Sequence, residues 1–469
     1  MAPIVILSDG TWCGREAGTK TNIYRLAKYI GIDVDTPDSL EEYVLSVPGK
    51  IHARYRHGVG LGSTFLDYLF NGVTAQDLAA ECIMGYKFIV DHYSEDDEVW
   101  LFGLSRGAYT VRCIAGMINN CGIVRKSGRP DEDVSLLCEE VYRIYRSRDA
   151  VNAPHSLQSE EFRRRNSHPL IGDGDVPRDP PVRFMGILDT VGELGIPTFT
   201  GGVGLDWPEF YDGVVSSVVG RVCHLVSLHD RFYIFQPCLA RRGDGCITGG
   251  IHEEWIPGVH YDLGRQRFRF FRVGAGIFES TLAHWAWATK PIEPNAVLAD
   301  FTLLRMLEHV QEVDSAGAVV PAANMQNALG DLRRAIAADA PTTGDGDVYE
   351  RVLRHAPFGE LLNGAAALGM KIAPGIWQLF LALRDRFIPS IDAAVYDLQQ
   401  RDPDTLAAES LAAIARVSPD RYPSRTLRAW GLRGGTAHLR GLPRAGSICC
   451  EEALTTVPEV GVLLDDTVM

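Results

Sequence analysis

The chain has 469 residues, of which 46% are hydrophobic and 23% charged, a balance typical of a globular protein with a sizeable core. Asp and Glu total 60 against 46 Lys and Arg, giving a formal net charge of −14, which argues against a nucleic-acid partner because phosphate binding needs clustered cations. The ten cysteines have no paired metal-ligand spacing and the N-terminus has no basic region or cleavage site, so we expect a cytoplasmic protein with reduced thiols.

The first half of the chain alternates apolar strand-like segments with helical ones. The sequence predicts strands at 3–8, 98–103 and 182–188, and helices at 22–31, 75–93 and 106–119. Such alternation is typical of parallel strands joined by crossover helices. We therefore expect an α/β fold, with a mostly parallel central sheet flanked by helices.

Three further segments depart from this pattern. Residues 124–180 are polar and charged, and residues 196–213 are rich in Gly, Pro and aromatic residues, so we expect insertions or a lid over the sheet. Beyond about residue 290 the chain becomes rich in Ala, Leu and Arg with helical periodicity. The prediction is a catalytic domain over 1–290 and a helical C-terminal region, a cap or subdomain, over 291–469.

One apolar segment, 361–383, is long enough to span a bilayer. Lys371 and Pro374 lie near its centre, where a charge is costly and a helix would break. We therefore predict two short helices, in the core or beside a substrate entrance, and no transmembrane segment.

The strongest local signal is Gly103-Leu-Ser105-Arg-Gly107, which lies between an apolar strand and a helix. In such a turn the glycines permit a bend so sharp that the serine stands above the sheet. The helix N-terminus then directs backbone N–H groups at the oxygen that becomes negative during attack. Ser105 is therefore the predicted nucleophile, and a capping serine in an ordinary strand-to-helix turn is the structural alternative.

A serine nucleophile needs a histidine to take its proton and usually an acid to orient that histidine. In α/β hydrolases the acid and then the histidine follow the nucleophile along the chain. Asp189 ends the strand after Ser105, and His260 follows a later strand-like segment, so we expect both at the same sheet edge. His224 and His229 are the alternative bases. A capping role for Asp189 and a surface position for His260 are the structural alternatives.

The first strand ends in Asp9-Gly-Thr-Trp12. A backbone N–H of Gly10 or Thr11 is predicted to complete an oxyanion hole with that of Arg106. Haloacid-dehalogenase-type phosphatases also carry Asp-Gly-Thr after their first strand, but they need a nucleophilic aspartate where this chain has Leu7. The hydrolase chemistry requires no metal and no organic cofactor.

Taken together, these segments resemble the class-one type VI secretion phospholipase effector family of α/β hydrolases. The matching segments cover roughly residues 1–290 in the family's order and are 8–12, 21–22, 58–60, 102–112 (Phe-Gly-Leu-Ser-Arg-Gly-Ala-Tyr-Thr-Val-Arg), 184–192 and 255–264. The resemblance implies an α/β-hydrolase fold, a triad of Ser105, Asp189 and His260, and a lipid substrate. No secretion-partner module is evident, so a toxin role is not predicted.

The expected activity is hydrolysis of a carboxylic ester, with a lipid or phospholipid acyl ester as the first candidate, through an acyl-enzyme on Ser105. One alternative is an esterase, lactonase or acyltransferase that acts on a small metabolite. Another is a catalytically silent hydrolase-fold protein that binds a ligand. The expected partner is a lipid or small ester, with peripheral lipid contact, and the sequence does not define the oligomeric state.

Overall fold

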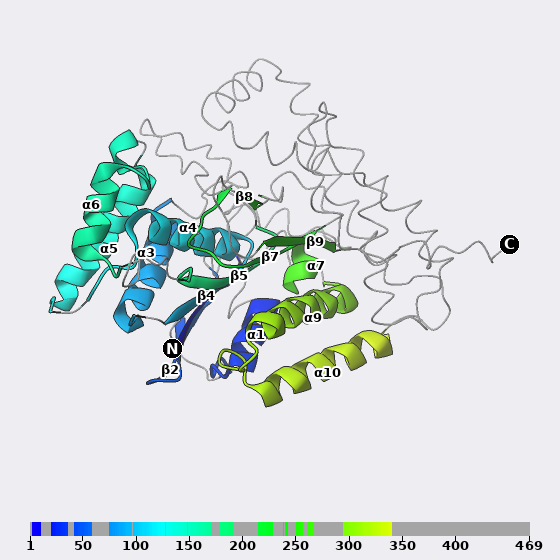
Figure 1. Cartoon of the computed structure of the whole chain (residues 1–469). Coiled ribbons are helices and arrows are strands. Elements are labelled where there is room, and N and C mark those ends of the chain that lie inside the picture. The colour runs from blue at the N-terminus through cyan, green and yellow to red at the C-terminus, as the bar shows by residue number, and fades with distance from the viewer. Residues whose placement is uncertain are drawn as a thin grey trace, which may run out of the picture.

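A computed structural model of the chain describes residues 2–10, 20–35, 42–58, 75–95, 97–126, 128–147, 149–169, 179–190, 214–227, 238, 240–242, 250–256, 260–266 and 294–339. Within these ranges the strands and helices alternate as the sequence predicts (Figure 1). Five of the six predicted elements end within one residue of the observed bounds, and the helix predicted at 106–119 extends two residues further, to Cys121.

The core of the fold is a seven-stranded sheet with the strand order β2-β3-β1-β4-β5-β7-β9. Its strands are β1 (Pro3–Ser8), β2 (Glu42–Val47), β3 (Ile51–Arg56), β4 (Glu98–Leu104), β5 (Val182–Leu188), β7 (Val222–Ser227) and β9 (Ile251–Ile256). Only the β2–β3 pair is antiparallel among these strands. A separate short pair joins β6 (Val214–Val215) and β8 (Arg241–Arg242). The central strands β1 and β7 are buried along their whole length, as expected of parallel strands covered on both faces.

Helices cover both faces of this sheet, which confirms the predicted α/β fold with a mostly parallel central sheet (Figure 1). The described helices are α1 (Asn22–Ile30), α3 (Ala75–His92), α4 (Arg106–Cys121), α5 (Asp131–Arg146), the short 3₁₀ turn η2 (Ala150–Asn152), α6 (Leu157–Asn166), α7 (His260–Gly264), α9 (Ala296–Val313) and α10 (Ala322–Asp339). Alternate residues of the strands divide the core into two apolar clusters. One packs against α1, α9 and α10, and the other packs against α3, α4 and α5.

Helices α9 and α10 lie beyond the predicted domain boundary at residue 290, yet both belong to a layer that covers the sheet. Phe301 and Leu304 of α9 are fully buried in the same apolar cluster as residues of β4, β5 and β7. An apolar helix has the same periodicity whether it covers a pocket or a sheet, so the sequence could not distinguish these roles. Residues 340–469, including 361–383, lie outside the described residues, and no described helix is long and apolar enough to cross a bilayer.

The predicted insertion at 124–180 is in part a component of the core. Helix α5, which falls within it, buries Val134, Cys138 and Val141 in the cluster that α3 and α4 also form. This segment therefore adds a helical layer outside α3 and α4. The predicted lid at 196–213 lies outside the described residues.

Candidate active site

Ser105 occupies the turn between β4 and α4 in a backbone conformation that side chains rarely adopt. Its φ is 57° and its ψ is −121°, and its hydroxyl makes no capping hydrogen bond to the helix. The neighbouring strand β5 stabilises this strained conformation, because the Ser105 N–H donates a hydrogen bond to the Leu188 carbonyl at 2.9 Å. Strained residues of this kind cluster at functional sites. The geometry is that of a nucleophile elbow and not of an ordinary capping turn.

The two glycines of the motif are required by close backbone contacts. A Cβ on Gly103 would lie 2.4 Å from the Gly107 carbonyl oxygen, and a Cβ on Gly107 would lie 2.1 Å from the Ser8 carbonyl oxygen. The first turn of α4 therefore rests directly on the end of β1, with no room for a side chain. This contact fixes the direction in which the helix leaves the sheet.

Gly107→Ala is expected to destabilise the fold by about 3 kcal/mol or more, because the clashing atoms belong to backbone that cannot rotate away. The measurement is urea unfolding followed by circular dichroism. Gly330→Ala, in the middle of α10, is the matched control, since its Cβ would meet only the Arg334 guanidinium at 3.7 Å. Equal stability of the two variants would contradict the close contact.

Asp189 and His260, the predicted acid and base, are joined by a hydrogen bond. Asp189 directly follows β5, His260 begins α7 just after β9, and the Asp189 Oδ2 to His260 Nδ1 distance is 2.6 Å. The exposed fractions of the two residues are 0% and 2%. Asp189 also has a positive φ, 41°, which turns its side chain away from the regular strand path. A short, buried carboxylate–imidazole hydrogen bond fixes both the tautomer and the orientation of the ring.

Ser227, at the end of β7, contacts the Asp189 carboxylate and was not predicted from the sequence as a site residue. Its N–H donates to Asp189 Oδ1 at 2.9 Å and its hydroxyl donates to Asp189 Oδ2 at 2.9 Å. The hydroxyl thus shares the oxygen that faces His260, and the two bonds fix the carboxylate plane. A signal was present, because Ser227 is a polar residue at the carboxyl end of a mostly apolar strand.

Ser227→Ala is expected to lower kcat on an ester substrate about 10- to 100-fold, because a hydrogen bond to a charged group contributes about 1.5–3 kcal/mol. KM should change little, since Ser227 acts through Asp189. Ser227→Thr keeps the hydroxyl and should restore most of the activity. Steady-state kinetics of the three proteins check this, and equal kcat for wild type and Ser227→Ala would rule the role out.

Helix α7, which carries His260, is held by contacts to both flanking layers. A Cβ on Gly264 would lie 2.7 Å from the side chain of Leu104, the residue before Ser105, so α7 packs against the elbow strand. The buried Asn22 amide donates to the carbonyls of Leu263 at 2.7 Å and Ala299 at 2.8 Å. Asn22 therefore ties α1 to α7 and α9 and fixes the height of His260 above the sheet.

The end of β1 is organised around the Asp9 carboxylate. It accepts hydrogen bonds from the hydroxyls of Thr21 at 2.5 Å and Tyr55 at 2.8 Å, and from the Gly10 N–H at 2.9 Å. Gly10 was a predicted oxyanion donor, but here its N–H points to Asp9. Thr11, the other candidate at this turn, lies outside the described residues. Arg106 is the first residue of α4, where backbone N–H groups lack helical partners.

Of the two alternative bases, His224 lies within the described residues, but not at the end of its strand. His224 lies in the middle of β7, paired in register with Ile187 and Glu253, and is fully buried. It is therefore three residues short of the strand end where Ser227 reaches Asp189. His229 lies outside the described residues.

Most of the chain matches a known protein family. The family model "T6SS, Phospholipase effector Tle1-like, catalytic domain" matches residues 3–306, well over half of the chain. The chain belongs to this family. The elbow, the Asp189–His260 pair and helix α9 as far as residue 306 all lie within the segment that matches the Tle1-like catalytic domain.

Two individual proteins are similar to this member of the Tle1-like family. "Uncharacterized protein YEL023C" of Saccharomyces cerevisiae (strain ATCC 204508 / S288c) is 26% identical over 241 residues, which are 49% of this chain and 31% of the yeast protein. The match thus spans less than a third of that relative's length. A solved structure, "Structure of the Tle1 effector bound to the VgrG spike from the Type 6 secretion system", has a TM-score of 0.34 and 16% identity, and covers 72% of this chain and 78% of that chain.

Proposed function

We propose that this chain is a serine hydrolase that cleaves acyl esters of lipids, with phospholipids as the first candidates. One observation carries the proposal: the buried hydrogen bond between Asp189 and His260 lies at the same sheet edge as the strained turn of Ser105. Strands β4 and β5 are direct neighbours, and their last residues, Leu104 and Leu188, are in register. The residues that follow them, Ser105 and Asp189, therefore lie side by side. The lipid substrate is supported by the family, whose description is that of a phospholipase effector.

In the proposed reaction the Ser105 hydroxyl attacks the ester carbonyl while His260 Nε2 takes its proton. Asp189 accepts the Nδ1–H of His260 and stabilises the imidazolium that forms. The Arg106 N–H, at the start of α4, donates to the oxyanion, and the second donor is the Thr11 N–H that the sequence predicts. His260 then protonates the leaving alcohol. In the second half-reaction His260 takes a proton from a water molecule that attacks the acyl carbonyl, and it returns this proton to Ser105 as the carboxylic acid leaves.

A fluorophosphonate probe tests the nucleophile directly, because such probes phosphonylate only an activated serine. We expect wild type to be labelled at Ser105, with no label on Ser105→Ala and much slower labelling of His260→Ala. Ser135→Ala, at a half-buried serine on α5 whose hydroxyl donates to the Asp131 carbonyl, is the matched control and should label like wild type. A folded wild type that does not label would identify the chain as a silent, ligand-binding member of its family.

A substrate comparison then tests the lipid assignment. We expect hydrolysis of phosphatidylcholine and phosphatidylglycerol vesicles, with release of free fatty acid that Ser105→Ala abolishes. Short p-nitrophenyl esters and lactones form the second arm, and a competing alcohol acceptor detects acyl transfer. Activity restricted to the short esters would replace the lipid assignment by a small-metabolite esterase while leaving the nucleophile unchanged.

We also propose that the enzyme works in the cytoplasm. The six described cysteines (Cys82, Cys113, Cys121, Cys138, Cys223 and Cys238) are all free thiols, which suits a reducing compartment. Fractionation of the native host, followed by probe labelling of each fraction, tests this assignment.

A further inference from the structure

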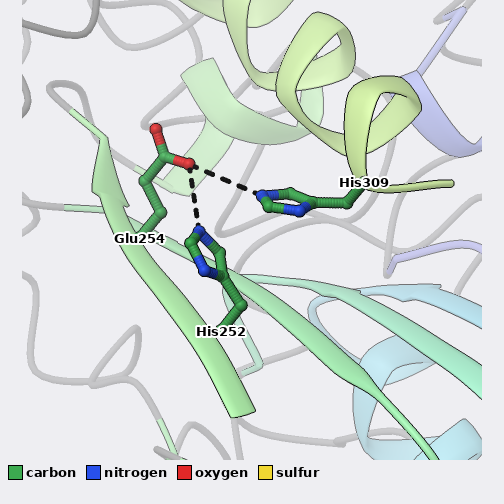
Figure 2. A group of neighbouring side chains, drawn as sticks. All are labelled: His252, Glu254 and His309. Atoms are coloured by element: carbon green, nitrogen blue, oxygen red, sulfur yellow. Dashed lines mark ion pairs between the residues drawn. The ribbon is translucent and has the colours of Figure 1, made fainter. Parts of the chain in front are cut away.

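A second cluster of chemically active side chains lies outside the hydrolase site. His252 and Glu254 are two residues apart on β9, so their side chains leave the same face of the sheet. His309 reaches them from α9, the helix that covers that face (Figure 2). One ligand atom from each of the three side chains lies within 4.8 Å of the other two. Because His252 stands near the start of β9, this cluster is separated along the strand from His260, which follows its end.

His309 is the member that calls for an explanation. It is only 4% exposed, and its Nε2 has no hydrogen-bond partner within the described part of the chain. A buried ring nitrogen without a partner is costly. This nitrogen faces the Glu254 carboxylate, with Nε2 to Oε2 at 4.0 Å, and His252 Nε2 lies 3.8 Å from the same oxygen (Figure 2). Both gaps are too long for hydrogen bonds.

We propose that His252, Glu254 and His309 form a binding site for a divalent transition-metal ion, with Zn²⁺ as the first candidate. Two imidazoles and one carboxylate are a ligand set that zinc commonly takes. Zinc–ligand bonds of about 2.0–2.1 Å in a tetrahedron set neighbouring ligand atoms about 3.4 Å apart, so small side-chain rotations would close the observed gaps. The His252 side chain is 45% exposed, which leaves an entry path and room for a water molecule as the fourth ligand.

The charges around the cluster are compatible with a cation. Arg305 Nε donates to Glu254 Oε1 at 3.1 Å and to Oε2 at 3.0 Å. A carboxylate has about four lone-pair sites, so it can accept this donor and still bind a metal. Such an outer partner orients a ligand.

The positive charge of the nearby arginines is largely compensated. Arg305 also pairs with Glu308, and Arg221 pairs with Glu312, next to His309 Nδ1. Arg333 also pairs with Glu308, so with Glu254 included three carboxylates face three guanidiniums around the site. The charges of these side chains therefore balance, and no excess positive charge opposes the ion. Since its ligands come from two layers, the bound metal would clamp the edge strand β9 to α9 and would act on stability, independently of the hydrolase reaction.

Zinc titration of the full-length chain, kept reduced with a phosphine reductant, tests the proposal. We expect one Zn²⁺ per chain by metal analysis after dialysis, and a rise of the thermal midpoint with zinc. His252→Ala, a half-exposed side chain on an edge strand, should lower the affinity at least ~100-fold, since loss of an outer partner alone costs 10–100-fold. His155→Ala, an exposed histidine outside the cluster, is the matched control and should behave like wild type.

Cobalt(II) gives a second readout that separates this site from the ten cysteines. Absorption bands of a nitrogen- and oxygen-ligated tetrahedral ion, without thiolate charge-transfer bands, are expected in wild type and in His155→Ala but not in His252→Ala. A wild type whose thermal midpoint ignores zinc, or a His252→Ala protein that binds zinc as tightly as wild type, would overturn the proposal. Neither outcome depends on probe labelling of Ser105, so this test and that of the hydrolase fail separately.

Discussion

Ser105→Ala is expected to lower kcat on a cleavable ester by about 10⁴- to 10⁶-fold, the range seen when the nucleophile of a serine hydrolase is removed. The reason is that no other hydroxyl on the described sheet edge shares the geometry of Ser105. Ser227 is also a serine at this edge, but its hydroxyl donates a hydrogen bond to Asp189. The measurement is kcat under saturating substrate with wild type, Ser105→Ala and Ser227→Ala purified side by side. A Ser105→Ala loss smaller than that of Ser227→Ala would refute the assignment.

A companion variant separates lost chemistry from lost fold. The φ of 57° at Ser105 is strained for any residue with a Cβ, and strain of this kind costs about 1–3 kcal/mol. Ser105→Gly should therefore be as inactive as Ser105→Ala while raising the free energy of unfolding by about 1 kcal/mol. A gain in stability together with a loss of activity is the signature of a strained functional residue. Loss of both would indicate that Ser105 supports the fold instead.

Much of the fold around the candidate site could be predicted from the periodicity of apolar residues and from the Gly103–Gly107 motif. The apolar segments at 3–8, 98–103 and 182–188 predicted parallel strands, because strands that are buried on both faces show no polar alternation. The structure confirms all three strands. Once parallel neighbours are assumed, the residues that follow them, Ser105 and Asp189, must lie at one edge. The order of these residues along the chain therefore predicted Asp189 and His260 as partners, and a 2.6 Å hydrogen bond joins them in the structure.

Other features depend on tertiary contacts that a single sequence does not reveal. Whether His224 or His260 is near Asp189 is decided by where β7 ends, since His224 falls mid-strand and Ser227 falls at the edge. The Gly10 N–H is directed to Asp9 because Thr21 and Tyr55 hold that carboxylate at the end of β1. Likewise His309 meets His252 and Glu254 only through the packing of α9 on β9, across about fifty residues of chain.

Asp189→Asn is expected to lower kcat about 10⁴-fold, although the substitution is nearly isosteric. Its amide can take only one orientation. The Ser227 N–H donates to Oδ1, so the amide oxygen must stay there and the NH₂ group must occupy the position of Oδ2, facing His260 Nδ1. An NH₂ donor forces Nδ1 to accept, which moves the ring proton to Nε2. His260 then carries a proton on the nitrogen that has to remove one from Ser105, and it cannot act as the base.

If Asp189 acts by setting the tautomer of His260, the kcat of a double variant can also be predicted. If Asp189 acts only through His260, its replacement costs almost nothing once His260 is gone, because residues that act as a unit are not additive. The Asp189→Asn/His260→Ala double variant should therefore match His260→Ala in kcat within a few-fold. Circular dichroism and the thermal midpoint of all four proteins control for folding around the buried Asp189. Losses that multiply in the double variant would mean that Asp189 contributes to the reaction, or to the fold, by a route that does not pass through the imidazole.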